Sequence, residues 1–133
     1  MKLEDIEGIG PARAMKLRAA GVRSTGALLT QGATAKGREA ISAASGFATS
    51  SILEWVNRAD LMRIRGVSTQ YSDLLEAVGV DSPTELARRN ATRLVGAFAD
   101  LNAKRRTVRR IPPEAIVAGW IDQAKKLPKL VTH

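Results

Sequence analysis

The chain of 133 residues contains no cysteine, and its single histidine, His133, is the last residue. The absence of cysteine excludes a disulfide framework and a thiolate metal site. The acidic residues are scattered, and the sequence has no Walker loop, dinucleotide fingerprint or metal-ligand cluster. We therefore expect a protein without catalytic activity, cofactor or bound metal.

Long apolar runs are also missing. The longest apolar run that could belong to a membrane span covers residues 115–121, and seven residues are far too few for a membrane helix. The N-terminus, Met-Lys-Leu-Glu-Asp, lacks the apolar core of a signal peptide. These features predict a cytoplasmic protein with no membrane partner.

Aromatic residues make up only 4% of the chain, so Ala, Leu, Ile and Val must supply most of its core. The alternation of β-branched residues that is typical of strands is missing, whereas Ala, Leu and Arg favour helices. The composition predicts an all-α fold.

Basic residues are in excess, with a net charge of +8. Residues 1–63 carry nine basic and six acidic residues, and residues 64–133 carry twelve and seven. A basic surface favours the binding of polyanions, and it binds nucleic acid through counterion release. The alternative is that the charge serves only solubility. Double-stranded DNA is the partner that we expect first.

An internal repeat divides the chain. Residues 6–29 match residues 64–87 at an offset of 58, and the two tryptophans match later at an offset of 65. Repetition of this kind indicates one structural unit used twice. We therefore predict two fused repeats of about four helices each, over residues 1–63 and 64–133. The identities at offset 58 are Ile6/Ile64, Gly8/Gly66, Leu17/Leu75, Ala19/Ala77, Gly21/Gly79, Val22/Val80, Ser24/Ser82 and Leu28/Leu86.

Capping signals predict where the helices begin. A small polar residue precedes most of the apolar periodic segments, and a prolyl pair precedes the last one. The first helix is predicted over residues 11–20, and the last is predicted to begin after the break at Pro112–Pro113. The helices between them are predicted to begin at a capping box, Ser51–Glu54, and at the caps Ser24, Thr34, Ser68, Ser82 and Asn90.

The segment Gly8-Ile9-Gly10 followed by Pro11 predicts a tight turn that opens a helix. Free N–H groups at such a helix start attract phosphate. The spacing to Ala14 and Leu17 resembles the helix-hairpin-helix motif, whose backbone amides grip nucleic-acid phosphates without reading sequence. The candidate binding residues here are Gly8, Ile9, Gly10, Arg13 and Lys16. A tight turn with a purely structural role is the alternative.

The second copy of this turn departs from the pattern, because Ser68 replaces the second glycine and acidic residues follow it. Gly66 and Ser68 remain candidates for phosphate contact, but we expect them to serve packing. A stronger signal is the basic cluster at residues 104–110, where like charges repel unless an anion binds. Its candidate residues are Lys104, Arg105, Arg106, Arg109 and Arg110, and a solvated loop is the alternative.

Nearly the whole chain resembles a bacterial family known as domain of unknown function 4332. The similar segments are Ile6–Lys16, Glu54–Leu61, Arg65–Val67, Tyr71–Leu75 and Leu127–His133. The resemblance implies a helix-hairpin-helix fold and brings no established activity. The sequence as a whole favours a non-catalytic protein that binds DNA without sequence specificity. The alternative is a protein-interaction or scaffold module built on the tandem repeat.

Overall fold

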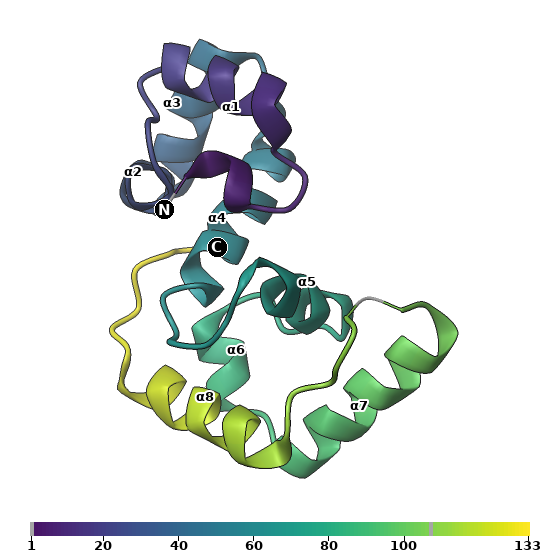
Figure 1. Ribbon diagram of the computed structural model, residues 1–133. Helices are drawn as coiled ribbons and strands as arrows, with labels where there is room; N and C mark the ends of the chain where they lie inside the picture. Colours follow the sequence, from purple (N-terminus) through teal and green to yellow (C-terminus); the bar gives the residue numbers. More distant parts are fainter. Residues whose placement is uncertain (1, 107) are drawn as a thin grey trace. The chain divides into compact units, whose positions relative to one another are not determined.

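The computed structural model describes every residue except Met1 and Thr107, and the described residues form eight α-helices and no strand (Figure 1). The predicted all-α class is confirmed. A short 3-10 helix, η1 (Leu3–Asp5), precedes α1 (Gly10–Ala19), α2 (Thr25–Gln31), α3 (Ala35–Ser45) and α4 (Thr49–Leu61). The remaining helices are α5 (Thr69–Ala77), α6 (Pro83–Ala87), α7 (Ala91–Lys104) and α8 (Glu114–Lys126).

The chain forms two compact units. The first comprises Met1–Asp60 together with Lys129–His133, and the second comprises Leu61–Pro128. The sequence division at residues 63 and 64 differs in two ways: the structural boundary lies three residues earlier, and the last five residues belong to the first unit. Their attachment is a set of hydrogen bonds, including Thr132 N–H to the Ala33 carbonyl at 2.8 Å.

Most helices begin at the predicted caps. Five side-chain oxygens accept an N–H group from the first turn of the following helix, which satisfies a donor that the helix itself cannot. The predicted capping box is wrong, because α4 already begins at Thr49 and Ser51 therefore lies within its first turn. The confirmed caps are Ser24 on α2, Thr34 on α3, Ser68 on α5, Ser82 on α6 and Asn90 on α7.

The core of the first unit is aliphatic, with one large aromatic side chain. Helix α1 packs on η1 and α3, and α2 packs on α3. Trp55 of α4 is 5% exposed and makes an edge-on contact with Phe47, their ring centroids 5.2 Å apart. Trp55 is therefore part of this core.

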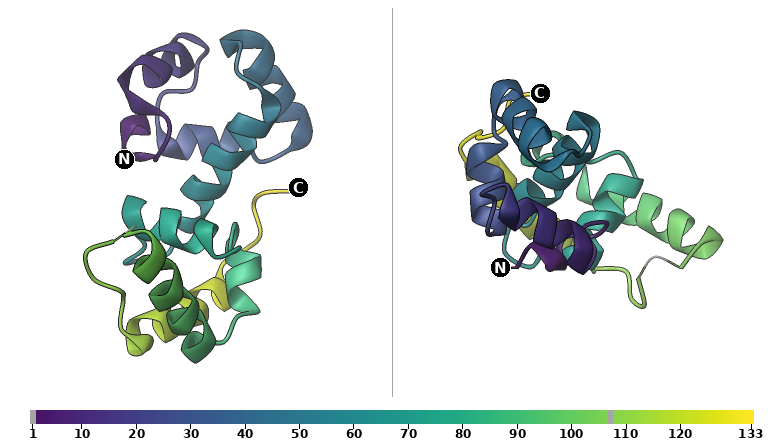
Figure 2. Two further views of the ribbon diagram at one scale, coloured as in Figure 1. Left: turned by 90° about the vertical axis from the view of Figure 1, so that its right-hand side faces the viewer. Right: turned by 90° about the horizontal axis from the view of Figure 1, so that it is seen from above.

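The second unit encloses Trp120 of α8, which is 2% exposed and lies against Tyr71. Helices α6 and α7 pack on α8, and α5 packs on α7. Residues 108–113 return from the far end of α7 to the start of α8 (Figures 1 and 2). The hydroxyl of Thr92 in α7 consequently meets the carboxylate of Glu114 in α8.

Several hydrogen bonds recur 58 residues apart, in agreement with the sequence repeat. Each repeat ends its first long helix on a glycine with a φ angle near +90° and caps its next helix with a serine. The recurring bonds are Val22 N–H to Leu17 O and Val80 N–H to Leu75 O (2.9 Å each), Gly21 N–H to Arg18 O and Gly79 N–H to Glu76 O (3.0 Å each), and Gln31 to Gly21 O and Arg89 to Gly79 O (3.2 Å each).

Candidate nucleic-acid interface

The turn Gly8–Gly10 joins η1 to α1. Gly8 and Gly10 have φ angles of +92° and +65°, which disfavour residues with a side chain. Ile9 between them is buried in the core, and its N–H donates to the Ile6 carbonyl at 3.2 Å. Ile9 therefore anchors the turn, and its own amide is already engaged.

Helix α1 begins without a side-chain cap. Its N-cap is Ile9, whose side chain has no oxygen, and Pro11 lacks an N–H group. The amides of Gly10 and Ala12 lie in the first turn, where a helix has no acceptor of its own. This helix start differs from those of α2 and α3 in the same unit, which are closed by hydroxyl oxygens.

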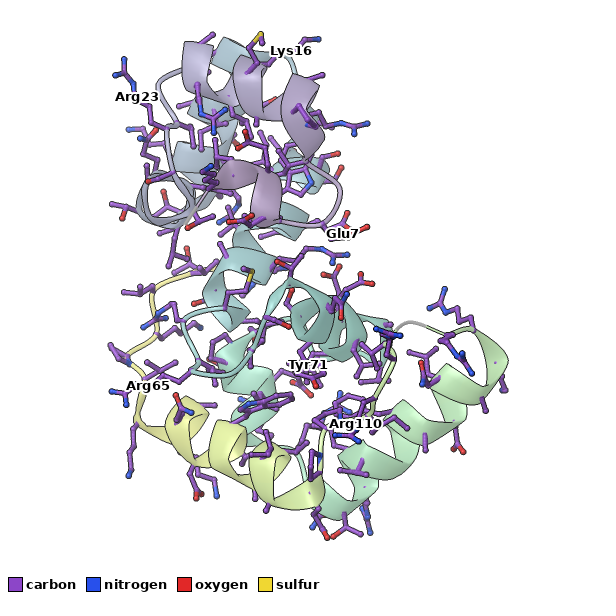
Figure 3. The ribbon with its side chains drawn as sticks, in the orientation of Figure 1. Glu7, Lys16, Arg23, Arg65, Tyr71 and Arg110 are labelled. Atoms are coloured by element: carbon purple, nitrogen blue, oxygen red, sulfur yellow. The ribbon has the colours of Figure 1, made fainter. Side chains whose placement is uncertain are left out.

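Two basic side chains flank this helix start. The Arg13 guanidinium donates to the Gly8 carbonyl at 3.1 Å, which holds its positive charge at the turn. The Lys16 ammonium lies 5.9 Å from the centroid of the Phe47 ring, within the range of a cation–π contact. Lys16 extends outward from α1 (Figure 3).

These groups share one open cleft of about 820 Å³. Its opposite wall comes from the start of α4 and the preceding link, and includes Phe47 and Trp55. Glu54 also lines the cleft, but its carboxylate is paired with Arg58 at 3.3 Å. The result is a cleft with an uncapped helix start and two cations on one side and aromatic rings on the other.

Arg18 is not part of this cleft, although it follows the turn closely in sequence. Its guanidinium holds Glu4 with contacts of 2.5 and 3.2 Å. The hydrogen bond from Arg18, with help from the backbone, lowers the pKa of Glu4, and the same bond raises the pKa of Arg18. Arg18 thus fastens η1 to α1.

The turn Gly66–Ser68 has a different environment. Gly66 repeats the positive φ angle of Gly8, at +93°, but Ser68 has a φ angle of −81° and its hydroxyl caps α5. Gln123 of α8 also grips the turn through the N–H (2.8 Å) and carbonyl (3.2 Å) of Arg65.

The side chains around the two turns differ as well. At an offset of 58, Tyr71 and Leu74 stand where the first unit has Arg13 and Lys16. Leu74 is buried, and Tyr71 packs on Trp120 with ring centroids 5.3 Å apart.

The basic cluster lies in the second unit and is divided. Lys104 ends α7 and Arg105 caps it. Arg109 and Arg110 belong to the segment 108–113 that leads to α8, and Figure 3 labels Arg110. Val108 is buried and its N–H donates to the Asn102 side chain at 3.2 Å, so it pins the segment to the core. Lys104, Arg105, Arg106, Arg109 and Arg110 are all exposed, and Thr107 lies outside the described residues.

The sequence did not identify the far wall of the cleft. Nothing in the sequence pattern relates Phe47 or Trp55 to the turn. The one available signal was the repeat itself, because both the glycines and the tryptophans recur in pairs. A Cβ atom on Gly8 would lie 3.5 Å from the Trp55 indole nitrogen, and one on Gly66 would lie 3.0 Å from that of Trp120.

Across residues 2–106 and 108–133, no group of His, Cys, Asp and Glu side chains could hold a metal ion. No helix in this part of the chain is long and apolar enough to cross a membrane.

Comparison with known proteins leads to one family. Searches of the curated proteins and of the solved structures gave no match. The model of the family described as a domain of unknown function (DUF4332) matches residues 7–127, which span both turns and all eight α-helices. The chain therefore belongs to the DUF4332 family.

Proposed function

We propose that this protein binds nucleic acid, duplex DNA in the first place, through the phosphate backbone and without reading sequence or performing catalysis. The observation that carries the proposal is the uncapped start of α1, with Arg13 and Lys16 beside it in one open cleft.

The helix start supplies the right chemistry for a phosphate. The amides of its first turn and the helix dipole both favour an anion, and two cations add charge. A Cβ atom on Gly10 would meet no atom within 4 Å, so there is room at this point of the backbone for a ligand to approach. Since such contacts touch only the phosphates, they carry no sequence information.

We further propose that both turns are copies of the helix-hairpin-helix motif and that only the first grips phosphate. The recurring hydrogen bonds support the common origin of the two segments. In the second turn, the Ser68 hydroxyl already occupies the donor that an anion would use, and Tyr71 and Leu74 replace the cations Arg13 and Lys16. This turn then serves packing around Trp120.

The excess positive charge supports a polyanion as the partner. The exposed Lys104, Arg105, Arg106, Arg109 and Arg110 would add contacts from the second unit. Contacts of this kind release counterions and make binding strongly dependent on salt.

The test is fluorescence anisotropy with random-sequence duplexes, titrated over salt. We expect the wild type to bind several sequences alike, with a log–log slope of about −0.9 per phosphate contact. The variant Arg13→Gln/Lys16→Gln should bind more weakly with a shallower slope. Its matched control is Arg23→Gln/Lys36→Gln, which removes the same charge from exposed positions of the same unit.

Absence of duplex binding by the wild type at low salt would overturn the proposal and favour a protein-interaction module. An RNA duplex of the same sequence, measured in parallel, compares the two nucleic acids.

A further inference from the structure

Three arginines meet at the corner between α6 and α7, and none of them is among the binding candidates discussed above. Arg88 caps the end of α6, Arg89 follows it, and Arg93 lies in the first turn of α7. Together with Asn90, Leu94 and Ala97 they line a pocket of about 250 Å³. Arg88 and Arg93 are exposed, whereas Arg89 is half-buried.

Arg89 has a structural task at this corner. Its guanidinium donates to the Glu85 carboxylate at 3.1 Å and to the Gly79 carbonyl at 3.2 Å. Glu85 is thus bound to Arg89, the half-buried arginine of the three. The positive charges of Arg88 and Arg93 are therefore left in excess at the mouth of the pocket.

The first unit shows that the fold does not need these charges. Gln31 makes the same bond to Gly21 that Arg89 makes to Gly79, so a neutral donor is enough. The residue at the position of Arg88 is Thr30.

The third arginine also lacks a basic counterpart. Arg93 is the third residue of α7, and its N–H donates to the Asn90 cap at 3.1 Å. The third residue of α3 is Gly37, which donates likewise to the Thr34 cap. A Cβ atom on Gly37 would lie only 1.9 Å from the Gln31 carbonyl oxygen, so that corner excludes any side chain there.

We propose that Arg88, Arg89 and Arg93 form a second phosphate-binding site, which takes a phosphodiester group of the same nucleic acid and so rests on the function proposed above. The guanidinium fork suits phosphate oxygens, and the arginine side chains supply the contacts, because the Asn90 side chain already accepts the Arg93 N–H group at the start of α7. The two units then hold the backbone with different parts of the repeat. The first uses its glycine turn, and the second uses its α6–α7 corner.

The experiment compares the wild type with Arg88→Gln/Arg93→Gln and leaves Arg89 in its structural role. The matched control is Lys125→Gln/Lys126→Gln, which removes the same charge from the far end of α8. Each is titrated with the same duplex of about 20 base pairs over salt. Thermal melting checks that every variant is folded.

We expect the arginine variant to bind several-fold more weakly, and its log–log slope to become shallower by about 0.9 for each phosphate that it no longer neutralises. The backbone amide of Arg93 should also shift in ¹⁵N spectra when duplex is added to the wild type. An unchanged affinity and slope, or an equal loss in the lysine control, would overturn the site. Either result differs from failure of the proposed function, in which the wild type itself does not bind duplex.

Discussion

Gly66 lies so close to Trp120 that a methyl group on its Cα would come within 3.0 Å of the indole nitrogen. Gly8 and Trp55 form the corresponding pair in the first unit, where the same methyl group would lie 3.5 Å from the indole nitrogen, at ordinary contact distance. The two glycines have almost the same φ angle. This pair therefore separates the effect of backbone strain from that of close approach.

Replacement of either glycine by alanine should destabilise its unit. A side chain at these positive φ angles costs about 1–3 kcal/mol in both places. Gly66→Ala should lose more than Gly8→Ala, because only there must the tryptophan move. Urea unfolding, followed by tryptophan fluorescence, measures the difference. Equal losses would show that φ strain alone decides.

Gly10→Val tests the first turn as a phosphate site. The valine strains the φ angle of +65° and places methyl groups where a phosphate would approach the backbone. We expect duplex binding to fall several-fold or more, with the fold checked by thermal melting. Ser68→Val at the equivalent position should change binding less, although loss of the cap costs about 1 kcal/mol of stability. A folded Gly10→Val variant that binds like the wild type would remove the turn from the interface.

Charge removal from the basic cluster forms a separate test. Changing Arg105, Arg106, Arg109 and Arg110 to Gln should weaken duplex binding and flatten its salt dependence, by about 0.9 in slope for each phosphate released. The cluster begins with Lys104, at the end of α7 opposite to Arg93 and about 17 Å from it along the helix axis. The effects of changing the arginine corner and of changing Arg105 and Arg106 should therefore add, because distant sites act independently. An unchanged slope in the fourfold variant would mean that the cluster faces solvent or a protein, which would favour the scaffold module.

The bond between Glu4 and Arg18 predicts a pH dependence of stability. Because the pKa of Glu4 is lowered in the folded state, its contribution is present above the ordinary glutamate pKa. That contribution is lost as the pH falls through the lowered value. Glu4→Gln should therefore be less stable than the wild type at neutral pH, and the gap should close in acid. Unfolding curves over a pH series measure the gap, and a gap that persists in strong acid would contradict the assignment.

Arg38 provides a test of how the C-terminal residues are attached. Its buried guanidinium donates to the Gly32 and Thr132 carbonyls, each at 2.8 Å. Arg38→Met should lower the free energy of unfolding by about 1.5–3 kcal/mol, since hydrogen bonds from a charged group are removed. Proteolysis should then cut near Thr132 faster. A tail that resists cleavage as before would show that buried Val131 and the bonds of Thr132 to Ala33 and of His133 to Asn57 hold it without Arg38.

Local chemistry made much of the fold predictable. A serine, threonine or asparagine before an apolar periodic run fixed five helix starts, because each cap bond lies within four residues of sequence. The capping box predicted at Ser51 was wrong because α4 begins earlier in the chain. There the Ala48 carbonyl accepts hydrogen bonds from the Ser51 and Ile52 amides. Nothing in the side chains of that link announces such a start.

The candidate site was predictable only on the side that is contiguous in sequence. Gly8, Gly10, Arg13 and Lys16 lie within nine residues, so turn and helix geometry bring them together. Phe47 reaches the same cleft through packing on Trp55, which no local pattern encodes. The site at the α6–α7 corner was missed for a related reason, since Arg88 and Arg93 come together across the break between two helices.

The attachment of residues 129–133 to the first unit bears on the order in which the protein can fold during synthesis. Arg38 and Asn57 are made early, but their partners, the Thr132 carbonyl and the His133 ring, follow only after the whole second unit. Val131 is likewise buried in the first unit, whose other core residues are synthesised much earlier. Domains generally fold from the N-terminus as they emerge. Here the first unit emerges first but is completed last. Until residues 129–133 are made, the surface that they will cover stays exposed.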